Sequence, residues 1–229
     1  MIDTLIDKLD TFEVVRDKIF QILAQEVTNQ MALATTAGKD PDDWFFHIYR
    51  ERSDPWEQYL NIDPENTTKQ AIAPIINVWF EQDNVNQSGS QNYDRQDTKG
   101  LFNIDCYGMG ISQNVAGGGY LPGDQVAALE SQRAARFGRN VIMSATYLDL
   151  ELPVGVVSQK WMSNKQVFER PQIENNAVQD VIATRMQLEV RYLENAPQIT
   201  AEVLEEIYIK NQRATDQFVL SEVEIDFTA

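Results

Sequence analysis

Few residues of this chain could break or form covalent bonds. It has one histidine, His47, and one cysteine, Cys106. Nucleophilic catalysis needs a serine or cysteine beside a base, most often histidine. His47 belongs to an aromatic cluster, which favours a packing or hydrogen-bonding role, and Cys106 adjoins Asp105, whose charge disfavours a thiolate. We therefore predict no catalytic residue and a protein that is not an enzyme.

Motifs for cofactors and metals are incomplete. The Gly-Met-Gly sequence at 108–110 lacks the third glycine of a dinucleotide-binding loop. No Lys-Ser or Lys-Thr pair follows the triple glycine at 117–119. Asp40, Asp42 and Asp43 offer the oxygens that hard cations prefer, but not in an EF-hand loop. We expect no cofactor and no metal. Catalysis by paired carboxylates stays open, because such pairs converge only in three dimensions.

Composition and charge narrow the class of protein. The 229 residues, 43% hydrophobic and 10% aromatic, fit one soluble globular domain or two small ones. The net charge of −16 repels nucleic-acid phosphates, which disfavours ordinary nucleic-acid binding. One cysteine excludes an intrachain disulfide and favours a reducing compartment. The N-terminus lacks a basic signal region and no apolar run could cross a bilayer, so we expect cytoplasmic folding and no membrane contact.

Hydrophobic periodicity predicts an α+β fold. Apolar residues at helical spacing predict a helix over 2–26, capped by Asp3 or Thr4, and a second over 124–147, capped by Asp124. Alternation predicts strands at 74–80, 100–111, 154–167 and 182–192, and a C-terminal hairpin or arm. We expect a single domain over 1–229, with an antiparallel β-sheet of about four or five strands packed by the two helices and joined by long loops.

Three segments interrupt this pattern. An aromatic-rich insertion over 38–68 contains three Asp-Pro steps, and its aromatic residues should dock on the body of the protein or on a partner. The almost wholly polar stretch 81–99 is predicted to be a long hairpin loop. A C-terminal extension covers 197–229. The polar stretch and this extension are either variable surface loops or arms that reach a neighbouring subunit.

Three arginines on the second helix are the candidate interface residues. Arg133, Arg136 and Arg139 are spaced by three residues and wind across one broad side of the helix. One interpretation is local pairing, for example between Glu130 and Arg133, which contributes at most a few tenths of a kcal/mol. The other is a subunit interface between basic and acidic patches.

Three short segments carry a resemblance to a known family. They are the sequence NVWF at 77–80, the sequence NIDCYG at 103–108, and the loop and long strand over 172–192. In this order, and with the two helices, they resemble the tail terminator and neck proteins of contractile-tailed bacteriophages. The aromatic insertion and the extension after Ala196 depart from that family, which leaves the neck layer open.

The resemblance implies a structural virion protein without catalytic residues. It implies a homohexamer, a ring that terminates the tail tube and joins it to the neck, with tail tube, sheath and neck or connector proteins as partners. DNA would pass through the central channel without specific contacts, and an acidic or neutral wall would not arrest it. The place of such a protein is the tail or neck of the virion, after assembly in the host cytoplasm.

Two kinds of alternative remain at this point. Within the structural class, the chain could be a head-completion or connector protein of another neck layer. From another class, it could be a small carboxylate-dependent hydrolase, or a carbohydrate-binding domain that uses the aromatic residues over 44–59 to stack on sugars. A ring subunit forms oligomers, whereas the hydrolase would be a monomer or dimer and would have a concave pocket with two or more acidic residues of shifted pKa.

Overall fold

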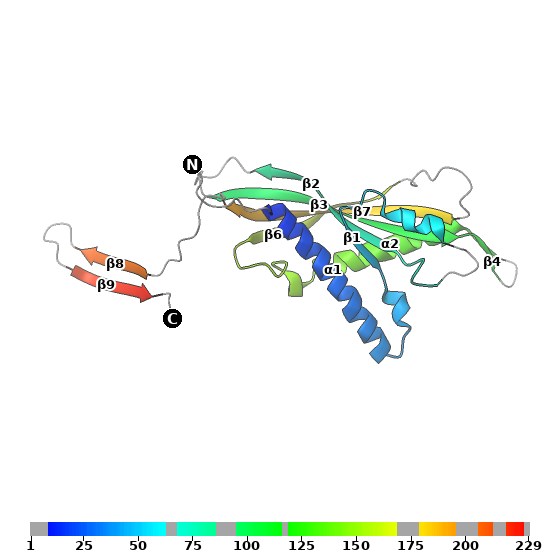
Figure 1. Ribbon diagram of the computed structural model, residues 1–229, viewed down its shortest axis with the longest axis horizontal. Helices are drawn as coiled ribbons and strands as arrows, with labels where there is room; N and C mark the ends of the chain where they lie inside the picture. The colour runs from blue at the N-terminus through cyan, green and yellow to red at the C-terminus, as the bar shows by residue number, and fades with distance from the viewer. Residues whose placement is uncertain are drawn as a thin grey trace. The chain divides into compact units, whose positions relative to one another are not determined.

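A computed structural model describes residues 9–62, 68–85, 95–115, 119–168, 179–195, 206–212 and 219–226. The chain divides into two compact units, residues 8–194 and residues 1–7 with 195–229. The first unit contains the helices and the main sheet (Figure 1). The second contains the expected C-terminal hairpin, in which β8 (Glu206–Gln212) pairs antiparallel with β9 (Val219–Asp226). The α+β class is confirmed.

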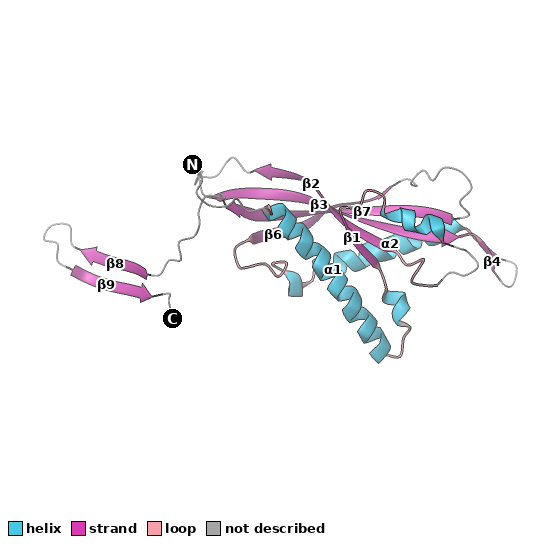
Figure 2. Ribbon diagram, in the orientation of Figure 1, coloured by secondary structure: helices cyan, strands magenta, loops and turns pink. Residues whose placement is uncertain are grey.

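The main sheet has five strands in the order β1-β2-β3-β7-β6 (Figure 2). They are β1 (His47–Arg50), β2 (Ile75–Val85), β3 (Arg95–Ile111), β6 (Val157–Phe168) and β7 (Gln179–Asn195). The pairs β2–β3 and β6–β7 are antiparallel, which agrees with the antiparallel sheet that the sequence predicted. The sheet is mixed because β1 runs parallel to β2. Four residues are too few to show an alternating pattern, so the sequence did not reveal β1. A separate ribbon pairs β4 (Gln113–Val115) with β5 (Gly119–Leu121).

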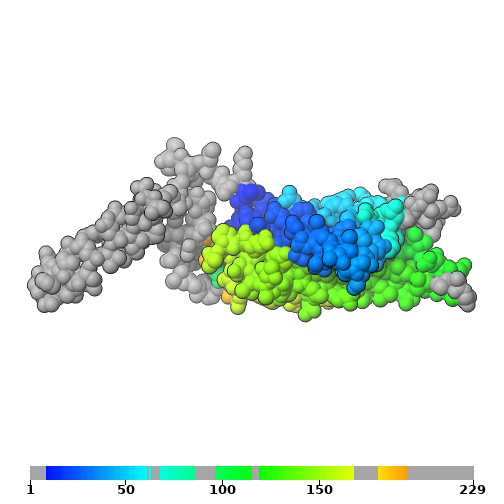
Figure 3. Space-filling view, turned by 90° about the horizontal axis from the view of Figure 1, so that it is seen from below, coloured from blue at the N-terminus to red at the C-terminus, as the bar shows by residue number. Residues whose placement is uncertain are grey.

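Two long helices cover one face of the sheet. They are α1 (Thr11–Thr36) and α2 (Gly123–Ile142), which contact each other and whose atoms lie next to each other in Figure 3. Their apolar sides bury the alternate residues of the central strands, chiefly Val78, Ile104 and Leu188. Apolar side chains of this size stabilise the fold by about 1.5–3 kcal/mol each when fully buried. The predicted arrangement of two main helices on a sheet of four or five strands is confirmed.

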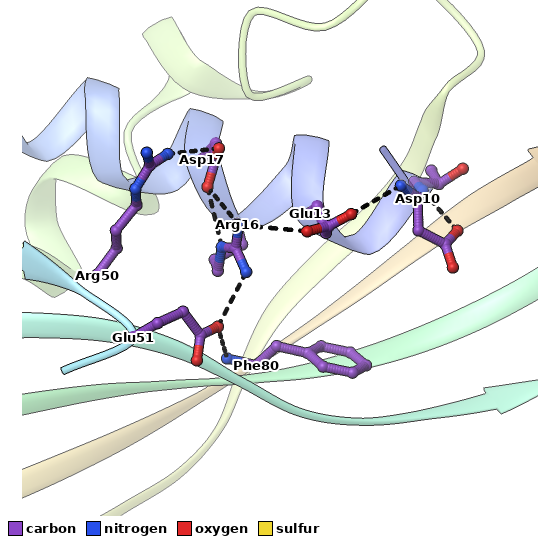
Figure 4. Close-up of polar contacts among 8 residues, drawn as sticks. Asp10, Glu13, Arg16, Asp17, Arg50, Glu51 and Phe80 are labelled. Carbon is purple, nitrogen blue, oxygen red and sulfur yellow. Dashed lines mark hydrogen bonds and ion pairs between the residues drawn. The ribbon is translucent and has the colours of Figure 1, made fainter. Parts of the chain in front are cut away.

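Both helices differ from their predicted bounds. The helix expected over 2–26 begins at Thr11 and ends at Thr36, while Asp3 and Thr4 lie outside the described residues. Asp10 and Glu13 form a capping box, in which each side chain accepts a backbone N–H at the helix start (Figure 4). The second helix begins at Gly123 without a side-chain cap, so the Asp124 prediction is wrong. It ends at Ile142, before a short 3₁₀ helix, η3 (Ala145–Tyr147).

The prediction of a long loop over 81–99 is also wrong. Strand β2 continues to Val85 and β3 begins at Arg95, so most of this stretch lies in strands, and its remaining residues, 86–94, are outside the described ranges. A ladder of backbone hydrogen bonds extends beyond the apolar core, and polar side chains do not prevent this. A Cβ at Gly100 would lie 2.7 Å from the Tyr192 ring and 2.9 Å from an Asp83 oxygen. Glycine at 100 therefore lets these two side chains meet across the sheet.

The aromatic insertion docks on the body of the protein, one of the two outcomes expected for it. Besides β1, it contains two 3₁₀ helices, η1 (Pro41–Trp44) and η2 (Pro55–Asn61). Phe46 and Tyr59 are buried, and the Tyr59 hydroxyl donates to the Ala73 carbonyl over 2.7 Å. Tyr59 packs with Ile75 and Met109 on the sheet face opposite α1 and α2. The insertion thus covers part of both faces, and these two aromatic rings are not free to stack on a ligand.

Candidate functional site

A pocket of about 750 Å³ lies between α1, α2 and the aromatic insertion. The rings of Phe46 and Phe137 stack in it with their centroids 4.6 Å apart. Arg133 and Arg136 line it from α2, whereas Glu26 and Asp43 line it from α1 and η1. The pocket therefore has one basic and one acidic wall beside the stacked aromatic pair.

Arg133 is satisfied within the chain. It lies half-buried, 3.1 Å from Glu130 on the same helix, and its guanidinium stands 5.7 Å from the centroid of the Phe46 ring. This is the local pairing that the sequence allowed. Because Arg133 already has a carboxylate and an aromatic partner, it is the weakest of the three predicted interface residues.

Arg136 and Arg139 differ from Arg133. Both are exposed, and neither forms an ion pair with any residue that the structure describes. Leu129 and Arg136 are seven residues apart, so they lie on the same side of α2, and Met143, the residue directly after the helix, follows seven residues later. Leu129 is 58% exposed and Met143 41% exposed. We call the surface formed by Leu129, Arg136, Arg139 and Met143 the α2 outer face.

The acidic wall of the pocket is fixed by a hydrogen bond. The Tyr147 hydroxyl donates to Glu26 over 2.6 Å and connects η3 to α1. This bond lowers the pKa of the Glu26 carboxyl and raises the pKa of Tyr147 to about 12. Glu26 is consequently charged at neutral pH and held in one orientation.

The residues first considered for catalysis or metal binding have structural roles. The His47 Nε2 lies 2.8 Å from the Gln70 carbonyl, and burial lowers the pKa of its ring. Cys106 is fully buried, and burial raises the pKa of its thiol, as expected for an inert cysteine. Lys69 lies 2.5 Å from Asp40 and 2.9 Å from Asp43, so a lysine already neutralises this pair. Within the described ranges, no group of three metal-ligating side chains could hold an ion.

A buried polar network on the opposite sheet face was missed by the sequence analysis. Asp105 accepts two hydrogen bonds from Arg185, at 2.7 and 2.8 Å, and one of 2.8 Å from the Trp79 indole. Arg185 also stacks over Trp79, 4.7 Å from the ring centroid. Further along β7, Arg191 lies 3.7 Å from Asp97 of β3. Residue numbers thus rise along β7 as those of its partners on β3 fall, which makes the two strands antiparallel. The signal was present as alternating polar residues in both strands, but it did not indicate which residues pair.

Three carboxylates from distant parts of the sequence gather where α1 begins. Asp10 caps α1, Asp83 lies on β2 and Glu194 on β7. Burial and the charge of Asp10 raise the pKa of Asp83, although the Tyr192 hydroxyl donates to it over 2.5 Å. Burial and the charges of Asp10 and Asp83 raise the pKa of Glu194. No described cation forms an ion pair with these three residues. We call them the acidic cluster.

The acidic cluster gives stability a predictable pH dependence. A carboxyl whose pKa is raised by folding binds protons more tightly in the native state than in the unfolded state. Its contribution to the free energy of unfolding is therefore full below about pH 4.3, and it is lost as the pH rises through the folded pKa. We expect Glu194→Gln to raise the melting temperature, and the gain over wild type to grow from pH 4 to pH 7. Thermal unfolding across this range, at concentrations where the chain is monomeric, measures the gain. Glu57→Gln, at an exposed acid on η2, is the control, and equal gains at every pH would contradict the prediction.

Comparison with protein-family models gives no match, and comparison with curated proteins gives none either. None of the helices among the described residues is long and apolar enough to span a bilayer.

Proposed function

We propose that the chain is a structural subunit that closes into a ring with copies of itself, and that this ring terminates a bacteriophage tail tube and joins it to the neck. The ring of this proposal is a hexamer in the virion tail or neck, with tail tube, sheath and connector proteins above and below it and DNA passing through its channel. Each subunit supplies shape and contact surfaces.

The α2 outer face is the observation that supports this proposal. The chain has 35 acidic and 19 basic residues, yet Arg136 and Arg139 form no ion pair with any described residue, and they lie between two exposed apolar side chains. Most of the other basic side chains that the structure describes are paired with carboxylates, as Arg16, Lys69 and Arg185 illustrate. A basic face that forms no ion pair with described residues attracts an acidic surface of another copy of this acidic chain. Contact between two different surfaces is heterologous, and it generates a ring when the rotation from copy to copy closes.

Subunit stoichiometry tests the proposal most directly. Native mass spectrometry of the purified chain at about 10–50 µM, where a contact with a dissociation constant of about 1 µM or less is largely formed, is expected to give a closed oligomer, with six subunits as the predicted number. Negative-stain images of the same sample should show rings with a central channel. A chain that stays monomeric throughout this range would refute the ring proposal. Binding of the ring to isolated tail tubes is expected for a terminator and not for a connector of another layer, so this measurement distinguishes the two.

Charge reversal on α2 is expected to weaken the oligomer. In Arg136→Glu with Arg139→Glu, an acidic neighbour would meet two like charges, and we expect the dissociation constant to rise about tenfold or more. Both side chains are exposed, so the melting temperature should change by less than about 3 °C. Sedimentation velocity measures the assembly and circular dichroism the fold.

The matched control places the same change of charge elsewhere. Arg52→Glu with Lys165→Glu also reverses two exposed cations that lack ion pairs among the described residues. Its assembly should stay close to that of wild type. If both double variants weaken the oligomer equally, net charge rather than the α2 outer face is responsible.

A further inference from the structure

The body of the protein carries two charged surfaces that form no ion pair with any residue that the structure describes. The α2 outer face presents Arg136 and Arg139, one helical turn apart. The acidic cluster presents Asp83 and Glu194 beside the Asp10 cap, at the end of the sheet where α1 begins. Gathering three carboxylates costs free energy through their mutual repulsion. Such a cluster persists in a stable protein at low cost when cations of a partner neutralise it.

The two surfaces are too far apart to meet within one copy. The pocket beside the α2 outer face adjoins α1 at Glu26 and Gln30. Asp10 precedes Glu26 by sixteen residues, which corresponds to about 24 Å along the helix axis. The acidic cluster and the α2 outer face therefore lie on different parts of the surface.

We propose that the acidic cluster of one copy binds the α2 outer face of the next copy. This inference rests on the proposed ring function and names the two surfaces that form its repeating contact. Because the two surfaces differ, the contact is heterologous, and each copy offers one surface to the neighbour on either side. Repetition of this contact forms a ring when the rotation between copies closes, as the proposed ring function requires. Leu129 and Met143 supply the apolar contact that flanks the charges.

The acidic side of this contact is already ordered in the single chain. The Tyr192 hydroxyl holds Asp83 at 2.5 Å, and the lack of a side chain at Gly100 makes room for both. The capping box holds Asp10 at the start of α1, next to Glu13 (Figure 4). Side chains fixed before association lose less conformational entropy on binding, so an ion pair formed here is stronger than one between mobile surface residues.

Complementary charge reversal tests the contact. The basic-face variant carries Arg136→Glu with Arg139→Glu, and the acidic-cluster variant carries Asp83→Lys with Glu194→Lys. Each variant alone should assemble about tenfold or more weakly than wild type, because like charges meet in every contact. Mixed in equal amounts, the two variants should assemble again, since each reversed surface finds a reversed partner and each native surface a native one.

The composition of the mixed oligomer is the decisive measurement. Native mass spectrometry should show equal numbers of the two variants and only even totals, because a ring restored in this way must alternate. Random composition, or no recovery, would overturn the inference. If Asp83→Lys disturbs the Tyr192 contact and lowers the melting temperature, Glu194→Lys alone replaces the acidic-cluster variant and should restore part of the assembly.

Failure of this inference is distinct from failure of the ring proposal. A wild-type oligomer that neither variant weakens would retain the ring and reject these two surfaces as its contact. A wild-type chain that is monomeric would reject the ring itself. Oligomers that dissociate in the basic-face variant but not in the acidic-cluster variant would keep the α2 outer face and reject the acidic cluster as its partner.

Discussion

Replacing Gly110 by alanine is expected to destabilise the fold by about 3 kcal/mol or more, a large part of the 5–15 kcal/mol typical of a domain. A Cβ at this position would lie 2.0 Å from the Gly123 carbonyl oxygen and 2.8 Å from the Ala127 nitrogen. Both are backbone atoms of α2, so they can move only if the helix moves away from β3. Urea unfolding followed by circular dichroism measures the loss.

Gly138→Ala is the control for this prediction. The nearest atom to a Cβ at this position is the Met186 terminal methyl, at 3.2 Å, which belongs to a flexible side chain. Alanine inside a helix is favoured over glycine by up to about 1 kcal/mol. We therefore expect wild-type stability or a small gain. A Gly110→Ala protein with the wild-type urea midpoint would show that α2 does not pack on the β3 backbone as described.

The close packing of α2 on Gly108 and Gly110 could not be predicted from the sequence. They stood out as an incomplete phosphate-binding motif, and the residues themselves do not reveal that a helix crosses them. The strands were predictable because apolar and polar residues alternate along β3 and β7, and that alternation depends only on which face is buried. The start of α1 was also readable, since Asp10 and Glu13 have the spacing of a capping box. The apolar periodicity begins before Asp10, and it led to a predicted helix start at residue 2 rather than at Thr11.

The candidate site was predictable only in part, for a related reason. Spacing placed Arg136 and Arg139 on one side of a helix, and the structure leaves both exposed. That Arg133 pairs with Glu130 was open, because a helix permits this pair without requiring it. The acidic cluster could not be foreseen: Asp10, Asp83 and Glu194 come together only after β2, β7 and α1 have been placed. Local periodicity predicts faces, whereas contacts between elements depend on register and packing.

Removing the carboxylate of Asp105 is expected to cost about 3 kcal/mol of stability. The side chain is 4% exposed, and it accepts both hydrogen bonds of the Arg185 fork and that of the Trp79 indole. Asp105→Ala leaves a guanidinium and an indole N–H without their acceptor in a site where water replaces it poorly. Arg185 is 22% exposed, which lets it regain some hydration and keeps the cost below that of a fully buried charge. Chemical denaturation measures the loss.

A double-variant cycle and an exposed ion pair complete the test. In Asp105→Ala with Arg185→Met no buried charge is left unpaired, so the total loss should be smaller than the sum of the single losses by about 2 kcal/mol. Asp97 and Arg191 join the same two strands, but they are 36% and 40% exposed and 3.7 Å apart. Arg191→Met should therefore cost less than about 1 kcal/mol. Equal losses for Asp105→Ala and Arg191→Met would mean that water reaches both pairs alike, and that the Asp105 network does not hold β3 to β7.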